Sequence, residues 1–333
     1  MNWALFGAST IASQYMIDAI RGQGGRIGWV VSGDAVHAAA YRAKHEIGHW
    51  STAILEALED PGIEAVYISS TNDKHHAQAM AAIGAGKHVL CEKPLALDPS
   101  QAREMIAAAQ EAGVTLAVNH HLRSAGSHRA IRDLIAKGAV GRVLSVRVFH
   151  AVELPVHLRG WRLDDPKAGG GVIPDLTVHN ADTVRAALGE DPVSVVAEMA
   201  ATGLGKGVED SAMSVWTMPS GAMVFSHESF THPHAESGLE VHGTDGSILA
   251  RGIMAQEPVG EVTLVNAERR TPVEYDKGGL YAAVIRDFEG AVAQGRAPHA
   301  SGEDGLKSLL IARAVLAAAQ SGTRQMIEYG DKK

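Results

Sequence analysis

The stretch Asn2-Trp3-Ala4-Leu5-Phe6-Gly7-Ala8-Ser9-Thr10-Ile11-Ala12 decides the fold of the first part of the chain. Its opening apolar run predicts a buried β-strand. Gly7 marks a tight turn, and the apolar residues after it have the spacing of a helix: Ile11, Met16, Ile17 and Ile20. A strand, a glycine turn and a helix in this order are typical of the first unit of a dinucleotide-binding domain.

The alternation of strand and helix continues up to Val118. Further strands are expected at 27–32, 65–69, 88–91 and 115–118, and further helices at 54–58, 76–85 and 99–112. Ser51 is expected to cap the helix at 54–58. Strands joined by helices favour a parallel sheet that is covered on both faces. We therefore predict a doubly wound α/β Rossmann domain over residues 1–121.

The pattern after residue 121 is that of an α+β domain. Helices are expected at 128–137 and 174–188, strands at 142–151, 193–199, 212–217, 222–230, 239–242 and 262–266, and two helices at the end of the chain. Leu144, Val146 and Val148 form an apolar face that opposes a mixed face. We predict a substrate and catalytic domain over 122–333, built on an open, mostly antiparallel sheet.

Composition excludes several classes of protein. The 333 residues carry 30 Lys and Arg against 38 Asp and Glu, a net charge of −8, without the basic stripe of a nucleic-acid binder. Cys91 is the one cysteine in the sequence, which rules out an intrachain disulfide framework. No apolar stretch approaches the ~18 residues that span a bilayer, and the N-terminus lacks the cationic region of a signal peptide. We expect a cytoplasmic protein without nucleic-acid or membrane partners.

The glycine turn is a candidate site for a cofactor pyrophosphate. Gly7 forms the turn, and the small side chain of Ala12 lets the helix approach the sheet. Ser9 stands where the usual G-x-G-x-x-[GA] pattern has its middle glycine, and serine is small enough for a phosphate to approach. The N–H groups at the helix N-terminus would face the pyrophosphate. An ordinary strand–helix turn is the alternative.

The end of the second strand bears on the choice of nicotinamide cofactor. An acidic residue there binds the ribose 2′-OH and repels a 2′-phosphate. Ser32 is neutral and can donate to a phosphate, and His37 can add positive charge. Asp34 either points away or opposes the phosphate. We predict NADP(H), with NAD(H) as the alternative.

Three residues are candidates for catalysis. Lys93 follows the expected strand at 88–91, at the edge of the sheet where ligands bind, and can stabilise the charge that develops on a substrate oxygen. Asp175 and His179 are four residues apart, hence on one helix face. The carboxylate can orient the substrate, and the imidazole, which titrates near neutral pH, can deliver a proton. A surface lysine and a structural Asp–His pair are the alternatives for these residues taken singly.

Neighbouring segments supply weaker candidates. Trp161 and Arg162 are expected in a loop over the cofactor, and His150 at a strand end beside the sugar. Tyr281 either contacts the cofactor or packs beside Leu280. The histidine pairs and the His232-Pro233-His234 segment lack a carboxylate or cysteine at a convincing metal-ligand spacing, so we predict no metal.

Two longer motifs resemble those of a known family. His88-Val89-Leu90-Cys91-Glu92-Lys93-Pro94-Leu95 resembles the Glu-Lys-Pro signature of the glucose–fructose oxidoreductase, inositol dehydrogenase and MocA (Gfo/Idh/MocA) family. Gly169-Gly170-Gly171-Val172-Ile173-Pro174-Asp175-Leu176-Thr177-Val178-His179 resembles its second signature, a Gly-rich turn followed by Asp-x-x-x-His. Similar segments are spread over most of the chain: 119–123, 149–152, 160–163 and 240–244.

The resemblance implies an NADPH-dependent reductase of a cyclic sugar ketone, with 1,5-anhydro-D-fructose reduced to 1,5-anhydro-D-mannitol. It implies catalysis by Lys93, Asp175 and His179, with either Lys93 or His179 as the proton donor. It also implies sugar contacts from these three with His150, Trp161 and Arg162. The cofactor contacts that it implies are Gly7, Ser9, Thr10, Ile11, Ala12, Ser32, His37, Ser70, Thr71, Asn72, His75, Glu92, Lys93, Asn119, Trp161, Arg162 and Tyr281. His37 stands where similar reductases have an arginine.

Other functions fit the same motifs. One is an NAD-dependent dehydrogenase of a polyol such as an inositol, and another is a glycosidase that oxidises its substrate transiently with a tightly held NAD. A third is a non-catalytic NADP(H) sensor, which would not need the set of Lys93, Asp175 and His179. The protein is expected to be a monomer or a homo-oligomer formed through the open sheet.

Overall fold

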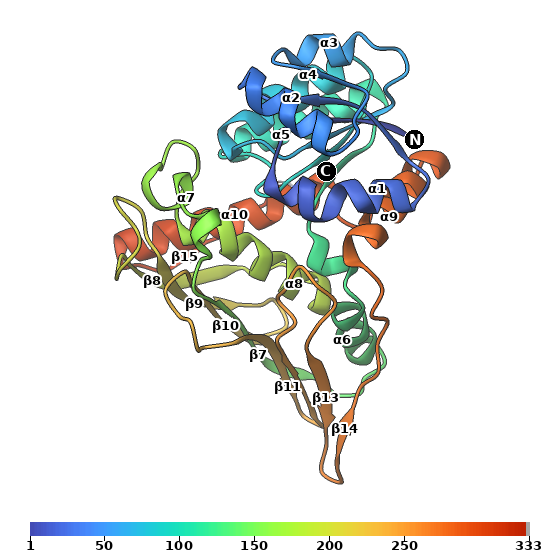
Figure 1. The fold of residues 1–333 in the computed structure, drawn as a ribbon. Helices are drawn as coiled ribbons and strands as arrows, with labels where there is room; N and C mark the ends of the chain where they lie inside the picture. The colour runs from blue at the N-terminus through green and yellow to red at the C-terminus, as the bar shows by residue number, and fades with distance from the viewer. Residues whose placement is uncertain (331–333) are drawn as a thin grey trace. The chain divides into compact units, whose positions relative to one another are not determined.

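The computed structural model describes residues 1–330 and forms two compact units (Figure 1). The first comprises Met1–His121 and Tyr281–Leu306, and the second comprises Leu122–Leu280 and residues 307–330. The expected change of domain after residue 121 falls between His121 and Leu122. The segment 281–306, assigned to the second domain from the sequence, packs instead with the first.

The first unit is a Rossmann fold. Its strands form a parallel sheet in the order β3-β2-β1-β4-β5-β6. The strands are β1 (Asn2–Phe6), β2 (Arg26–Val31), β3 (His49–Ser51), β4 (Ala65–Ile68), β5 (His88–Cys91) and β6 (Leu116–Val118). The helices are α1 (Ile17–Gly22), α2 (Ala35–Lys44), α3 (Ile54–Leu58), α4 (His75–Gly84), α5 (Pro99–Ala112) and α9 (Leu280–Gln294), with a π-helical turn η1 (Ala12–Met16) before α1 and a 3-10 turn η2 (Asn72–Lys74) before α4.

The predicted α/β fold is confirmed, with two local corrections. Helix α2 and strand β3 were not predicted, although Asp34 caps α2 by accepting a hydrogen bond from the backbone N–H of His37. Ser51 belongs to β3 rather than to the cap of α3; its hydroxyl accepts from the N–H of Ala53, which is the residue at the cap position.

Helix α9 returns to the first unit because its apolar side chains complete that core. The ring of Phe288 lies 5.1 Å from the ring of Trp3 on β1, and both side chains are buried. Tyr281, at the start of α9, stacks on Tyr15 at 4.9 Å and on His121 at 5.1 Å. Periodicity assigned α9 an apolar face, but it could not indicate which sheet that face would cover.

The second unit is built on a mixed, mostly antiparallel sheet, as predicted. Its order is β14-β13-β12-β11-β7-β10-β9-β8-β15, and the pair β7–β10 is parallel. The strands are β7 (Val143–Ala151), β8 (Ser194–Ala200), β9 (Ser211–Thr217), β10 (Met223–Ser229), β11 (Ser237–Gly243), β12 (Ser247–Arg251), β13 (Glu261–Val265), β14 (Arg270–Pro272) and β15 (Gln325–Met326). The helical segments are η3 (His121–Ser124), which begins in the first unit, α6 (Gly126–Ala136), η4 (Val156–Leu158), α7 (Trp161–Asp164), the π-helical turn η5 (Ile173–Thr177), α8 (Val178–Leu188) and α10 (Gly302–Ser321), which enters from the first unit.

One face of this sheet carries the core of the second unit, and helix α8 packs against that face (Figure 1). Val146 and Val148 of β7 point into it, as the alternation of the strand predicts, whereas Leu144 is exposed near the strand start. The opposite face presents exposed apolar side chains of β9 and β10, among them Met213 and Phe225. The unit is therefore one buried layer of helices on an open sheet.

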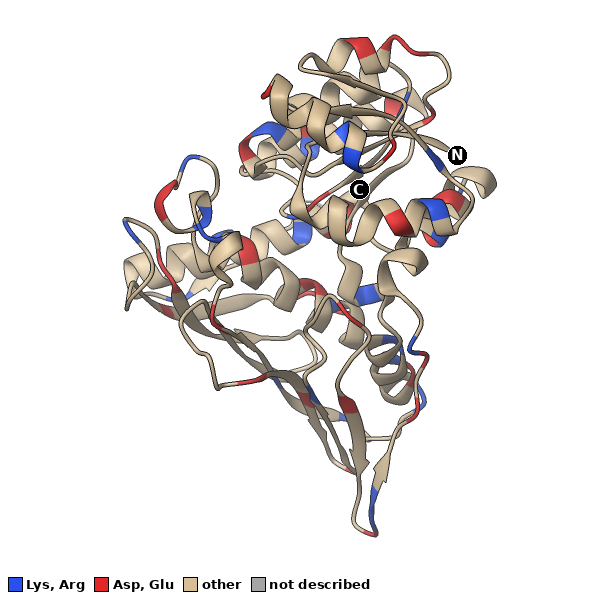
Figure 2. Ribbon diagram, viewed as in Figure 1, with Lys and Arg blue, Asp and Glu red and all other residues tan. Residues whose placement is uncertain are grey.

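Basic and acidic residues are interspersed over both units (Figure 2). None of the helices within residues 1–330 is long and apolar enough to cross a membrane.

The role of α9 can be tested by replacing Phe288 with alanine. Loss of this buried ring from the first core should lower the free energy of unfolding by about 3–5 kcal/mol. The control is Phe225→Ala on the open face of the second sheet, which should cost less than about 1 kcal/mol. Urea denaturation followed by circular dichroism measures both, and equal losses would contradict the packing of α9 described above.

Candidate active site

The glycine turn lies at the point where the strand order of the first sheet reverses. Gly7 follows β1, whose neighbours β2 and β4 lead to opposite edges of the sheet. Its φ of +115° is in the region that favours glycine, and a Cβ there would lie 2.7 Å from the backbone nitrogen of Ser70. The turn thus requires glycine, and the crevice at such a reversal is where open α/β sheets bind ligands.

Ser9 explains how the turn forms without its middle glycine. The Ser9 hydroxyl donates to Ser69 Oγ at 2.7 Å and accepts from the backbone N–H of Ala12 at 3.2 Å. Its side chain is therefore held by the turn itself. Thr10 and Ile11 lie at the start of the helical segment, where backbone N–H groups have no partner within the helix. The turn, the strand reversal and these donors fit a dinucleotide pyrophosphate.

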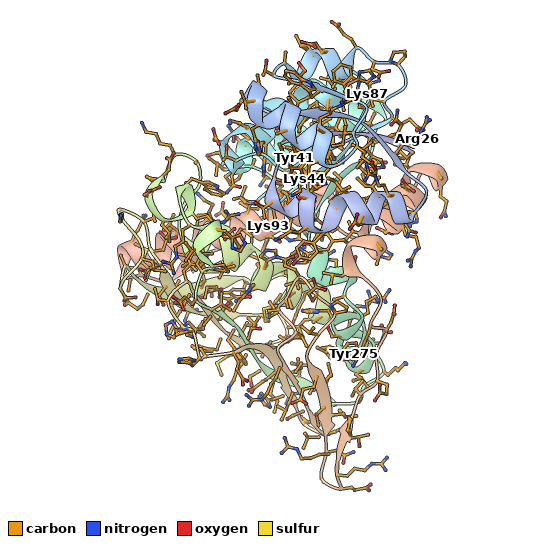
Figure 3. All side chains as sticks on the ribbon, in the orientation of Figure 1. Arg26, Tyr41, Lys44, Lys87, Lys93 and Tyr275 are labelled. Carbon is orange, nitrogen blue, oxygen red and sulfur yellow. The ribbon has the colours of Figure 1, made fainter. Side chains whose placement is uncertain are left out.

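Helix α2 binds the glycine turn from the side of the second strand. His37 Nε2 lies 3.0 Å from the carbonyl oxygen of Ala8, so this nitrogen carries the proton. The hydroxyl of Tyr41, labelled in Figure 3, donates to the carbonyl of Ser9 at 3.0 Å. Ser32 follows β2 and donates its backbone N–H to Ser51. The carboxylate of Asp34 caps α2 by accepting a hydrogen bond from the N–H of His37 at 2.9 Å.

The Glu-Lys-Pro segment follows β5 and holds a second polar network. The carboxylate of Glu92 accepts from the Tyr67 hydroxyl at 2.5 Å and from Asn119 Nδ2 at 2.6 Å. Burial raises the pKa of Glu92, while these hydrogen bonds and the neighbouring charge of Lys93 lower it. Lys93, labelled in Figure 3, precedes a cis peptide bond to Pro94. The anchored carboxylate beside it fixes the backbone from which the lysine projects.

His75 supports this segment from inside the protein. Its side chain is 0% exposed, with Nδ1 2.8 Å from the carbonyl oxygen of Pro94 and Nε2 3.2 Å from that of Ser70. Burial lowers the pKa of His75 although both carbonyls favour the protonated ring. The ring thus joins the ends of β4 and β5. Thr71 directly precedes η2, and Asn72 is buried in it.

In the second unit, a Gly-rich turn ties helix α7 to the segment that carries Asp175. The backbone N–H of Gly171 donates to the carbonyl of Arg162 at 2.9 Å. A Cβ on Gly170 would lie 2.5 Å from the carbonyl oxygen of Trp161, so α7 approaches more closely than a side chain would permit. The guanidinium of Arg162 stacks on the Trp161 ring at 4.5 Å, and its Nε lies 3.4 Å from Asp175 Oδ2.

The structure brings four predicted residues of this unit together. Asp175 lies in the π-helical turn η5 and His179 in the first turn of α8, and both are buried. The ring of His150 on β7 lies 6.1 Å from that of His179, centre to centre. With Arg162 against Asp175, the cluster offers a carboxylate, a cation and two imidazoles. These groups can bind hydroxyl groups and move a proton.

Two carboxylates near this cluster were not predicted. Glu209 Oε1 accepts from the N–H of Ile173 at 3.0 Å, at the start of η5, and burial raises the pKa of Glu209. Glu228 lies on the inner face of β10. Burial raises the pKa of its carboxyl to about 7, although hydrogen bonds from Ser226 and Asn180 lower it. In the sequence, Ser226 and Glu228 are two residues apart, so both occupy core-facing positions of one strand. This pattern of polar residues on an inward face could have revealed Glu228.

No group of three His, Cys, Asp or Glu side chains in residues 1–330 is arranged to hold a metal ion.

The titration of Glu228 predicts a pH dependence of stability. In the unfolded chain the carboxyl ionises near 4.5, whereas in the folded protein its pKa is about 7. Ionisation therefore favours the unfolded state progressively from pH 4.5 to 7, and stability falls over this window by about 3 kcal/mol. Glu228→Gln should lack this loss. Urea denaturation of both proteins from pH 4.5 to 8 measures the difference, and parallel curves would contradict it.

Two family profiles match the chain. One, described as the oxidoreductase family with an NAD-binding Rossmann fold, covers residues 1–120, and the other, described as the GFO/IDH/MocA C-terminal domain, covers residues 128–249. The 1,5-anhydro-D-fructose reductase of Ensifer adhaerens is 50% identical over 330 residues, 99% of each chain. The myo-inositol 2-dehydrogenase of Thermotoga maritima is 28% identical over 82% of this chain and 79% of its own.

Solved structures share the fold. The aldose-aldose oxidoreductase of Caulobacter crescentus, complexed with glycerol, aligns with a TM-score of 0.91 at 25% identity over 98% of this chain and 99% of its own. A levoglucosan dehydrogenase, in complex with NADH and levoglucosan, aligns with a TM-score of 0.87 at 22% identity over 98% and 99%. From these matches and the motifs above, the chain belongs to the GFO/IDH/MocA family of NAD(P)-dependent oxidoreductases.

Proposed function

We propose that the protein is an NADPH-dependent reductase that converts 1,5-anhydro-D-fructose to 1,5-anhydro-D-mannitol. The observation that carries this proposal is the 50% identity, over 99% of both chains, to the 1,5-anhydro-D-fructose reductase of Ensifer adhaerens. The residues for such a reaction are present in both units: a lysine at the edge of the parallel sheet, and a buried Asp-x-x-x-His segment beside an arginine.

The chemistry assigns one task to each catalytic residue. A bound nicotinamide supplies the hydride for the substrate carbonyl. Lys93 donates a hydrogen bond to the carbonyl oxygen and stabilises the negative charge that develops on it. His179 delivers the proton that completes the alcohol. Asp175, held by Arg162 at 3.4 Å, binds a substrate hydroxyl and keeps the sugar in register.

We propose that the NADPH preference comes from the end of β2. Ser32 donates its hydroxyl to the 2′-phosphate, and His37, bound to the glycine turn through Ala8, lies on the first turns of α2 beside it. A neutral residue follows β2 where NAD-binding folds place a carboxylate. The capping role of Asp34 engages its carboxylate within α2, which supports this assignment.

Steady-state kinetics of two variants test the catalytic roles. Lys93→Met should lower kcat by about 10²–10³-fold, because it removes a donor to the developing oxyanion. His179→Ala should lower it by about 10²–10⁴-fold. The controls are Lys74→Met and His234→Ala, both exposed positions, which should retain the wild-type rate. NADPH oxidation with the sugar measures all four, and wild-type turnover by Lys93→Met would refute the mechanism.

A single substitution tests the cofactor assignment. Ser32→Asp places a carboxylate against the 2′-phosphate, and the ratio of kcat/KM for NADPH over NADH should fall by at least about tenfold, or about 1.4 kcal/mol. Ser32→Asn, which is similar in size and uncharged, is the matched control. If both variants keep the wild-type ratio, the assignment of Ser32 to the 2′-phosphate is wrong.

A further inference from the structure

Beneath the segment that carries Asp175 and His179 lies a buried carboxyl that the reaction does not use. Glu228 is 0% exposed on β10, where it alternates with Val224 and Ser226 on the face toward α8. A carboxyl in the core costs free energy, so an apolar residue of similar size would serve stability better. Its position therefore needs another reason.

The contacts of Glu228 lead to the residue that directly follows His179. Asn180 Nδ2 donates to Glu228 Oε1 at 2.9 Å and lies 3.0 Å from Ser226 Oγ. The Ser226 hydroxyl donates to the same oxygen at 2.6 Å. Asn180 lies in the first turn of α8, beside His179. The carboxyl thus binds the helix at the residue next to His179.

The network lowers the stability of the folded protein, which argues against a purely stabilising role. Its donors are neutral amide and hydroxyl groups. Within residues 1–330, Glu228 Oε2 and Asn180 Oδ1 are buried without a hydrogen-bond partner. Buried polar atoms in this state destabilise a fold, because they lose their hydrogen bonds to water without replacing them. Such a cluster is expected where a conformation, rather than stability, is selected.

Strand pairing places the network beside the histidines. In the parallel pair β10–β7, Glu228 is in register with His150, whose ring lies 6.1 Å from that of His179. In-register residues of neighbouring strands project from the same face of the sheet. The carboxyl and the histidine cluster therefore share the inner face of this sheet.

We propose that Glu228 is a positioning residue, which holds Asn180 so that the neighbouring His179, and with it Asp175 one turn earlier, keep their orientation toward the substrate. This inference rests on the proposed function of Asp175 and His179. The hydrogen bond to Asn180 fixes the first turn of α8 where it follows the π-helical turn η5. A small displacement of a catalytic group is enough to lower kcat substantially.

A double-mutant cycle tests the proposal. Glu228→Leu and Asn180→Leu should each lower kcat by about ten- to a hundredfold, while KM for NADPH changes by less than about twofold. The double variant should lose no more than the worse single one, because both remove one network. Glu228→Gln keeps an acceptor oxygen and should retain at least about a third of the wild-type kcat. Thr183→Val, a buried isosteric change on the same helix, is the control.

Hydrogen exchange supplies a readout that does not depend on turnover. Exchange of the backbone amides of residues 173 and 175–180 should quicken at least about tenfold in Glu228→Leu and stay at the wild-type rate in Thr183→Val. If Glu228→Leu fails to fold, Ser226→Ala removes one donor and should show the same effects in reduced form.

The outcomes separate this inference from the proposed function. Faster exchange without sugar turnover by the wild type would support the structural role and refute the reaction. Wild-type kcat in Glu228→Leu, additive losses in the double variant, or unchanged exchange would each overturn the positioning role.

Discussion

The absence of a side chain at position 7 is the constraint on which the first unit depends. The backbone at Gly7 passes so close to Ser70 that a Cβ would lie 2.7 Å from its nitrogen. This approach brings the ends of β1 and β4 together at the strand reversal. Ser9 then closes the turn through Ser69, and α2 holds it from the other side through Tyr41. The helix N-terminus is thereby presented at the edge where Lys93 also emerges.

In the second unit, too, glycines permit a close approach of the backbone that positions functional side chains. Gly170 and Gly171 let α7 approach the start of η5, which places the guanidinium of Arg162 against Asp175. Two carboxyl groups hold the segment that runs from η5 into α8, Glu209 through the N–H of Ile173 and Glu228 through Asn180. In both units, backbone geometry that requires glycine and a supporting polar network determine where the reactive side chains project.

Much of the fold could be predicted because local signals agree with packing. Helix α5 was predicted with its observed bounds, since Asp98 caps it, Pro99 begins it and Gly113 follows it in the left-handed conformation. Helix α2 was missed although Asp34 is a good cap, because its small residues give little apolar periodicity. The partner of α9 and the contacts of Glu228 depend on tertiary packing that spacing does not encode.

The central claim is that hydride reaches the ketone carbon of 1,5-anhydro-D-fructose on this protein. The most direct measurement uses NADPH carrying deuterium at the transferable position of nicotinamide C4, with the product analysed by nuclear magnetic resonance. We expect 1,5-anhydro-D-mannitol with deuterium on the former carbonyl carbon. Consumption of NADPH without deuterium in the sugar, or deuterium at another carbon, would contradict it.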